Sequence, residues 1–127
     1  MKATYSLRPD LGYVFMTLSG SVTLAELGTH IQSVWSDPGW KAEYNGIIDF
    51  SAAKIDLSDQ EVTVLTHSMS TDPRCSFGRW ALVVSTATDF AKLRKFDPDA
   101  DLRSTIRIFF DRRTAEDWLL SRRGTGG

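Results

Sequence analysis

The sequence predicts an α/β fold with the element order ββαβαβαβα, in which about five strands form a mixed, mostly parallel sheet and about four helices cover it. A pair of alternating segments opens the chain, and short apolar runs then alternate with segments of helical periodicity. Three helical segments run into an Asp-Pro pair, at residues 37–38, 72–73 and 97–98, where helix is disfavoured. Successive strand–helix–strand units favour parallel pairing through right-handed crossovers.

The first two strands are predicted to form a β-hairpin over residues 2–7 and 13–18, which alternate between polar and apolar side chains. Between them, Pro9 presets one turn dihedral angle and Gly12 tolerates a positive φ. The apolar face of the second strand consists of Val14, Met16 and Leu18.

Three further strands are predicted. Residues 47–50 and 80–84 are strongly apolar runs, which is typical of strands buried on both faces. Residues 105–110 alternate instead, which predicts a strand with one wet face near a sheet edge. Its expected inner face consists of Ile106, Ile108 and Phe110, with Arg107 on the other side.

Each predicted helix begins at a residue that caps its N-terminus. Residues 23–26 and 58–61 have the capping-box spacing, in which two side chains satisfy unpaired backbone N–H groups. Thr86, with Asp89, begins a third helix, and Asp111 caps the last. The expected inward-facing residues are Leu24, Leu27, Ile31, Val34 and Trp35; Val62, Leu65 and Met69; Phe90, Leu93 and Phe96; and Ala115, Trp118 and Leu119.

Composition and charge limit the classes of function. The 127 residues, 42% of them hydrophobic, fit one domain, assigned to residues 1–121, with a flexible tail at 122–127. A net charge of -1 predicts no nucleic-acid partner, because phosphate binding needs a basic face. The single Cys75, the lack of an apolar leader and the lack of a transmembrane segment predict a cytoplasmic protein.

Four landmarks resemble those of the SpoIIAA-like branch of the STAS domain family, and the resemblance covers about Tyr5 to Leu120. They are the strand ending in Asp49-Phe50-Ser51, the helix start Asp56-Leu57-Ser58, the strand Ala81-Leu82-Val83-Val84 and the closing segment from Ala115 to Leu120. The resemblance implies a SpoIIAA/STAS-like fold. Many members of this branch are uncharacterised, and some are described as related to lipid-binding CRAL-TRIO (Sec14-like) domains.

The resemblance also bears on a phosphorylation switch. The best-known STAS proteins are anti-sigma factor antagonists, and they carry an Asp-Ser-Ser-Gly stretch whose first serine accepts phosphate from a partner kinase. The corresponding stretch in this sequence is similar to it only in part, since it reads Asp56-Leu57-Ser58-Asp59. Leu57 occupies the phosphoacceptor position and has no hydroxyl, so we expect the usual switch to be missing.

The sequence lacks a recognisable catalytic constellation. It has no Gly-rich phosphate loop, nucleophile elbow or zinc-binding helix motif. His30 and His67 fall on separate predicted helices, and Cys75 has no identifiable base. Asp49 and Asp56 form an acid–base pair only if the intervening segment brings them together. We therefore expect no enzyme, no metal site and no cofactor.

The most interesting polar residues follow the predicted parallel strands, where ligands of such sheets bind. These rim residues are Asp49, Ser51, Asp56, Ser58, Ser85 and Thr86, with Asp111 beyond them. Free N–H groups at helix N-termini suit an anion or a phosphorylated partner. The alternative is that Ser58, Thr86 and Asp111 only cap their own helices.

Two functions remain open. The first is a non-enzymatic, STAS-like regulatory or protein-binding module whose partner docks near Asp56 and Ser58, with a homodimer as an open option. The second is a carrier of a lipid or other small apolar ligand, as the CRAL-TRIO relation implies. That function needs a cavity among the aromatic residues.

Overall fold

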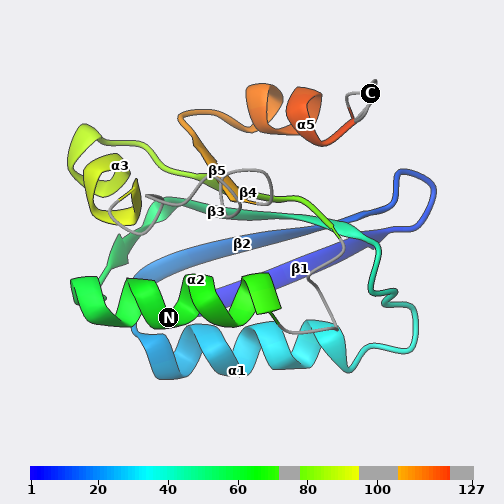
Figure 1. Ribbon diagram of the computed structural model, residues 1–127, viewed down its shortest axis with the longest axis horizontal. Coiled ribbons are helices and arrows are strands. Elements are labelled where there is room, and N and C mark those ends of the chain that lie inside the picture. The colour runs from blue at the N-terminus through cyan, green and yellow to red at the C-terminus, as the bar shows by residue number, and fades with distance from the viewer. Residues whose placement is uncertain (72–77, 95–105, 121–127) are drawn as a thin grey trace.

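The computed structural model describes residues 1–71, 78–94 and 106–120 of the chain. Its elements follow the predicted order. They are β1 (Lys2–Arg8), β2 (Tyr13–Val22), α1 (Leu24–Trp35), β3 (Asn45–Ile55), α2 (Asp59–Thr71), β4 (Trp80–Val83), α3 (Ala87–Arg94), β5 (Ile106–Phe109) and α5 (Arg112–Leu120). Figure 1 shows α1 and α2 side by side below the sheet and α5 above it.

The five strands form one mixed sheet in the order β1-β2-β3-β4-β5. β1 pairs antiparallel with β2 through the predicted hairpin, in which Gly12 has a φ of 73°. The pairs β2–β3, β3–β4 and β4–β5 are all parallel. This arrangement confirms the predicted fold class, and it places β5 at a sheet edge as expected.

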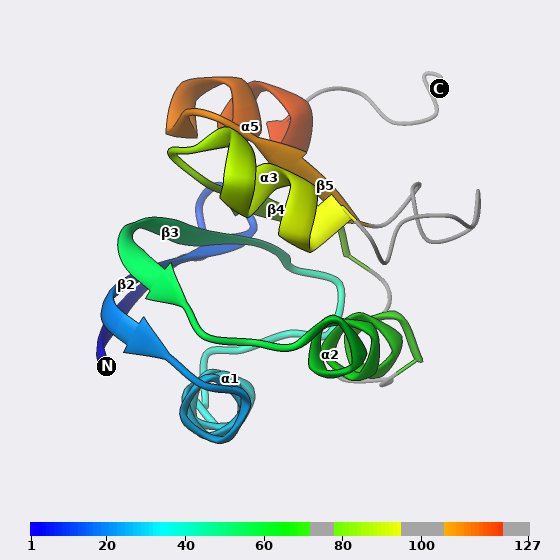
Figure 2. The ribbon, with the colours of Figure 1, turned by 90° about the vertical axis from the view of Figure 1, so that its left-hand side faces the viewer.

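Two hydrophobic clusters lie on opposite faces of the sheet. The larger contains Ile48 and Phe50 of β3, and it is covered by α1 and α2. The smaller contains Ile47 of β3 together with Ala115 and Leu119 of α5. Alternate residues of one strand therefore face both clusters, which confirms that β3 is buried on both sides. Figure 2 shows the two layers of helices with the sheet between them.

The prediction that Phe110 faces inward is wrong. Phe110 is 54% exposed, because β5 ends at Phe109 and the chain turns there toward α5. Predictions for Asp72-Pro73, Cys75, Phe96, Asp97-Pro98, the domain end at 121 and the tail at 122–127 lie outside the described residues, as does that for the side chain of Met69.

Candidate functional site

The predicted rim residues lie along the carboxyl edge of the sheet in two groups. Asp49, Ser51 and Ser85 lie close to the end of β4, since Asp49 pairs with Val83. Asp56 and Ser58 lie farther out, beyond the end of β3. The prediction that β3 ends near Ser51 is wrong: the strand continues to Ile55, because β2 is longer than expected and pairs with it throughout.

Asp49 shapes a β-bulge in β3. The register passes from Thr17↔Asp49 to Ser19↔Ala52, so β3 carries one residue more than β2 at this point. The Asp49 carboxylate accepts the Ser51 N–H at 2.8 Å inside the bulge. The hydroxyl of Ser85, in the connection between β4 and α3, donates to the Ser51 carbonyl at 3.3 Å and links this connection to the bulge. These polar groups therefore stabilise the local backbone.

Three of the predicted residues, Ser58, Thr86 and Asp111, cap helices. The Ser58 hydroxyl accepts the Glu61 N–H at 3.1 Å, and the Ser58 N–H donates to the Glu61 carboxylate at 2.9 Å. The Thr86 hydroxyl accepts the Asp89 N–H at 3.0 Å. The Asp111 carboxylate accepts hydrogen bonds from the backbone N–H and the hydroxyl of Thr114. These bonds, chiefly the one from the backbone N–H, lower the pKa of Asp111. Each of the three side chains therefore caps the helix that it begins.

Leu57, the residue at the phosphoacceptor position of the resemblance, is 2% exposed. Its side chain belongs to the larger hydrophobic cluster, with Val62 and Leu65 of α2. Ser58, the neighbouring hydroxyl, is exposed at the start of α2. The position that the resemblance assigns to the phosphoacceptor is therefore filled by a core side chain.

Asp49 and Asp56 are separated along the edge. The two residues are seven positions apart on a strand that runs to Ile55, and extended chain spans about 20 Å over that length. The Asp56 N–H donates to the Val22 carbonyl at 2.9 Å, which holds this residue at the end of β2. The acid–base pair considered from the sequence therefore does not form.

Lys92 of α3 is a rim residue that the sequence analysis missed. Its ammonium group donates to the carbonyls of Leu57 at 3.0 Å and Ile55 at 3.4 Å, on either side of Asp56. It places a positive charge beside the β3–α2 connection. Only the packing of α3 against this connection brings the two segments together, so no local pattern could reveal the contact.

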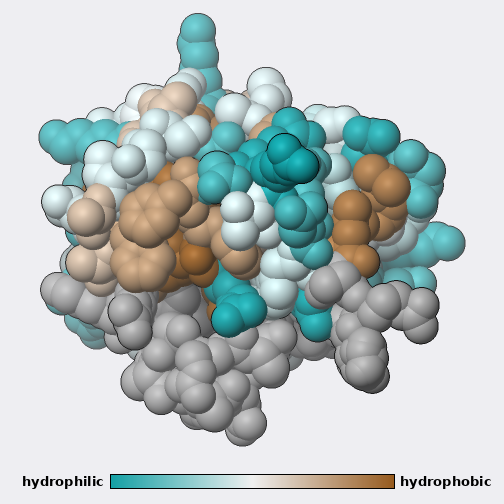
Figure 3. Space-filling view, turned by 90° about the horizontal axis from the view of Figure 1, so that it is seen from above, coloured by the Kyte–Doolittle hydropathy of each residue, from teal (hydrophilic) through white to brown (hydrophobic). Residues whose placement is uncertain are grey.

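A partly exposed aromatic pair lies beside the rim. The rings of Phe90 in α3 and Phe110 after β5 stack with centroids 5.0 Å apart and planes inclined by 13°. Phe90 is half-buried, whereas Phe110 is largely exposed. Figure 3 shows hydrophobic side chains in two groups on the polar face above the sheet. Phe110 is 54% exposed, and Leu120, at the end of α5, is 50% exposed.

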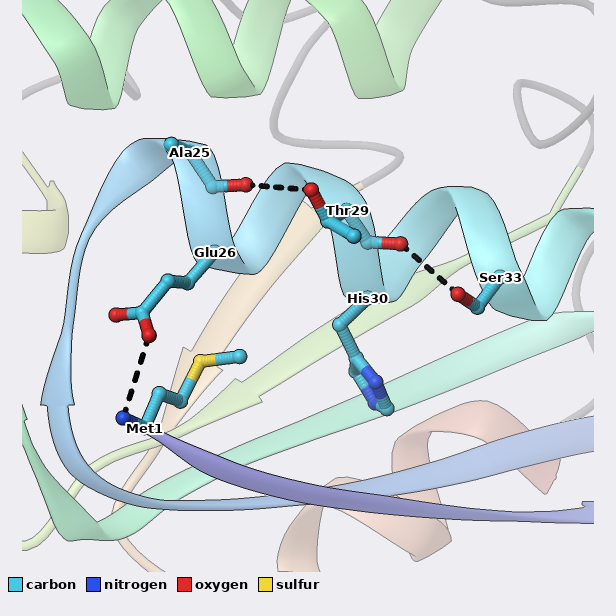
Figure 4. A pocket seen from close by; sticks show the side chains of 6 residues that line it. All are labelled: Met1, Ala25, Glu26, Thr29, His30 and Ser33. Atoms are coloured by element: carbon cyan, nitrogen blue, oxygen red, sulfur yellow. Dashed lines mark hydrogen bonds and ion pairs between the residues drawn. The ribbon is translucent and has the colours of Figure 1, made fainter.

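Two hollows flank α1. An apolar groove of about 260 Å³ separates α1 from α2 and is lined by Leu24, Gly28, Ile31, Gln32, Trp35, Val64, Leu65 and Ser68. A more open hollow of about 410 Å³ lies on the other side of α1, beside the amino end of β1. Figure 4 shows Met1 and Glu26 facing each other across this second hollow, with His30 extending from α1 toward the strands.

Replacing Ser58 tests its role as a cap. Ser58→Ala should lower the free energy of unfolding by about 1 kcal/mol, because the Glu61 N–H loses its acceptor. Ser58→Asp should change it by less than about 0.5 kcal/mol, because aspartate caps equally well. Urea denaturation of the two variants checks both values. An equal loss in both would show that the hydroxyl has another role.

His30 is half-buried between α1 and β1. Burial lowers the pKa of His30 from its ordinary value of 6.5, and a hydrogen bond with the backbone of Thr4 offsets part of this decrease. Its ring packs edge-on against Tyr5 at 5.9 Å. Among the described residues, no group accepts or donates a hydrogen bond at its Nε2 atom. The nearby charged groups are already bonded, Glu26 to the Met1 amine and Asp37 to the Tyr5 hydroxyl.

The lowered pKa of His30 predicts a loss of stability in mild acid. The unfolded chain takes up the proton more readily, so stability is complete above about pH 6.5 and falls as pH drops toward the folded-state pKa. His30→Gln should reduce this fall, whereas His67→Gln, on the exposed side of α2, should leave it intact. Urea denaturation at about pH 7.5 and about pH 5.5 measures it. An unchanged fall in His30→Gln would contradict the assignment.

Two further observations concern the described part of the chain. No three His, Cys, Asp or Glu side chains within residues 1–71, 78–94 and 106–120 are grouped so that they could hold a metal ion. In the same ranges, no helix has both the length and the apolar character needed to cross a membrane.

No family model matches the sequence, and no curated protein matches it. Among solved structures, the fold is similar to that of an uncharacterized protein of the DUF3478 family from Shewanella loihica, which has a SpoIIAA-like fold. The two chains share 19% sequence identity over 93% of this chain and 92% of that chain, with a TM-score of 0.55. At this identity the likeness concerns the fold alone. The chain therefore has a SpoIIAA-like fold, as its sequence landmarks predicted.

Proposed function

We propose that the protein is a non-enzymatic, STAS-like binding module that docks a partner protein on its rim without a phosphorylation switch. The observation that carries this proposal is the stacked Phe90–Phe110 pair beside the capped starts of α3 and α5. A partly exposed aromatic pair is the type of side chain that is enriched in protein interfaces.

Two features support the absence of catalysis and of the switch. The side chains of Asp49, Ser58 and Thr86 accept hydrogen bonds within the bulge and the helix caps, so these three maintain the backbone. Leu57 fills the phosphoacceptor position with a core side chain. We place the protein in the cytoplasm, and a homodimer that uses the same aromatic pair is one form that the partner can take.

An affinity-capture experiment tests the proposal. The wild-type protein, Phe110→Asp and Leu120→Asp serve as bait in native lysate, and the retained proteins are quantified by mass spectrometry. Leu120 is the matched control because it is similarly exposed, at 50%, but lies at the end of α5. A partner should be retained by wild type and Leu120→Asp and lost with Phe110→Asp. Equal retention by all three, or none by wild type, would refute docking at the aromatic pair.

The alternative function, a carrier of a small apolar ligand, is supported by one observation, the groove between α1 and α2. This groove lies on the helix layer below the sheet, away from the face that α5 covers. The two functions therefore use different surfaces and can be tested independently.

A further inference from the structure

The groove between α1 and α2 is open at a glycine that the fold does not require. Gly28 lies within α1, and a Cβ atom added there would meet no atom within 4 Å. Its φ is not positive, so the backbone conformation suits any residue. Glycine has the lowest helix propensity of any residue except proline. The one effect of this glycine that the structure shows is to leave space in the groove.

The residues that line the groove favour an uncharged ligand. None of the eight described residues that line it carries a formal charge, and its walls are formed mainly by Leu24, Ile31, Trp35, Val64 and Leu65. A charged group placed against these residues would lose hydration without gaining an ionic partner. The amide of Gln32 and the hydroxyl of Ser68 are the polar groups in the described lining, and both are neutral.

The size of the groove limits the occupant further. Its volume of about 260 Å³ exceeds the roughly 150 Å³ cavity that holds one benzene molecule. It falls below the range of about 300–1,000 Å³ typical of sites for drug-sized ligands. Val64 on its wall is 50% exposed, so an occupant of this size would cover apolar surface that water now contacts.

We propose that the groove between α1 and α2 is a binding site for a small, uncharged apolar molecule of one or two rings, kept open by Gly28. Trp35 and the aliphatic side chains that line the groove surround its rings. The site lies on the helix layer opposite the face that α5 covers, so it operates whether or not a protein docks at Phe110.

A titration with indole, observed by amide chemical shifts of the whole chain, tests this site. Saturable shifts should concentrate at Gly28, Ile31 and Val64, together with the side-chain N–H of Trp35. Octanoate, a charged probe of comparable size, should bind at least tenfold more weakly. Absence of saturable shifts, or shifts centred on the aromatic pair at Phe110, would overturn the proposal.

Substitution at Gly28 supplies the matched variants. Gly28→Leu should weaken indole binding at least tenfold by filling the groove, whereas Thr29→Leu, one residue along on the exposed side, should leave it unchanged. Gly28→Ala keeps the fold measurable, since it should raise the thermal midpoint by about 4 °C through helix propensity. Unaltered indole binding by Gly28→Leu would contradict the site. Sedimentation of each variant tests whether a second copy of the chain occupies the groove. A shift of Gly28→Leu from a dimer to a monomer would identify that occupant and would also overturn the proposal.

Discussion

Replacing Leu57 with serine should lower the free energy of unfolding by about 4 kcal/mol. Leu57 is 2% exposed, and its side chain packs in the larger hydrophobic cluster. The substitution leaves a cavity, and truncating a buried leucine typically lowers the free energy of unfolding by about 2–5 kcal/mol. It also buries a hydroxyl group. Urea denaturation gives the change. The variant that restores the family's phosphoacceptor by sequence would therefore damage the fold.

The control for this prediction is Leu57→Met, which preserves volume and should cost less than about 1.5 kcal/mol. A loss of less than about 1 kcal/mol for Leu57→Ser would contradict the buried placement of this residue. Such a result would also reopen the possibility that the β3–α2 connection turns outward and presents residue 57 to a kinase.

Replacing Gly46 with alanine should cost about 3 kcal/mol. Gly46 pairs with Trp80 across β3 and β4, and the indole of Trp80 covers it. An added Cβ would overlap the six-membered ring of Trp80, with Cη2 only 2.7 Å away. Trp80 is fully buried in the larger cluster, so it has no free direction in which to move. Overpacking of this kind typically costs about 1–3 kcal/mol and occasionally more.

A double-mutant cycle separates this clash from other effects. Gly46→Ala combined with Trp80→Leu should be at least about 1 kcal/mol more stable than the sum of the single changes predicts, because the smaller side chain removes the overlap. Gly28→Ala is the matched control, since its Cβ meets no neighbour and the change should be neutral or stabilising. Additivity of the two changes would show that the ring does not cover Gly46.

The features predicted most accurately from the sequence are local ones. The capping residues Thr23, Ser58, Thr86 and Asp111 each start the expected helix, because a cap depends only on residues within one turn of it. The turn at Gly12 and the two-sided burial of residues 47–50 follow equally local patterns.

The features that the sequence could not supply depend on contacts between distant segments. β3 extends to Ile55 because it pairs with a lengthened β2, and no apolar pattern marks that extension. Phe110 does not continue the alternation of β5, because the chain turns there toward α5. Its ring stacks on that of Phe90 in α3. The contact of Lys92 with the carbonyl of Leu57 arises in the same way. The candidate surfaces are therefore products of packing.

We propose that the protein binds its partner through the stacked Phe90–Phe110 pair, without a switch at the start of α2. The most direct test is the dissociation constant of the captured partner for wild type, Phe110→Asp and Ser58→Asp, measured by titration calorimetry. We predict that Phe110→Asp weakens binding by at least about tenfold, the effect of losing a single anchor residue, and that Ser58→Asp stays within about twofold of wild type. A partner that Ser58→Asp releases and Phe110→Asp still binds would contradict the account.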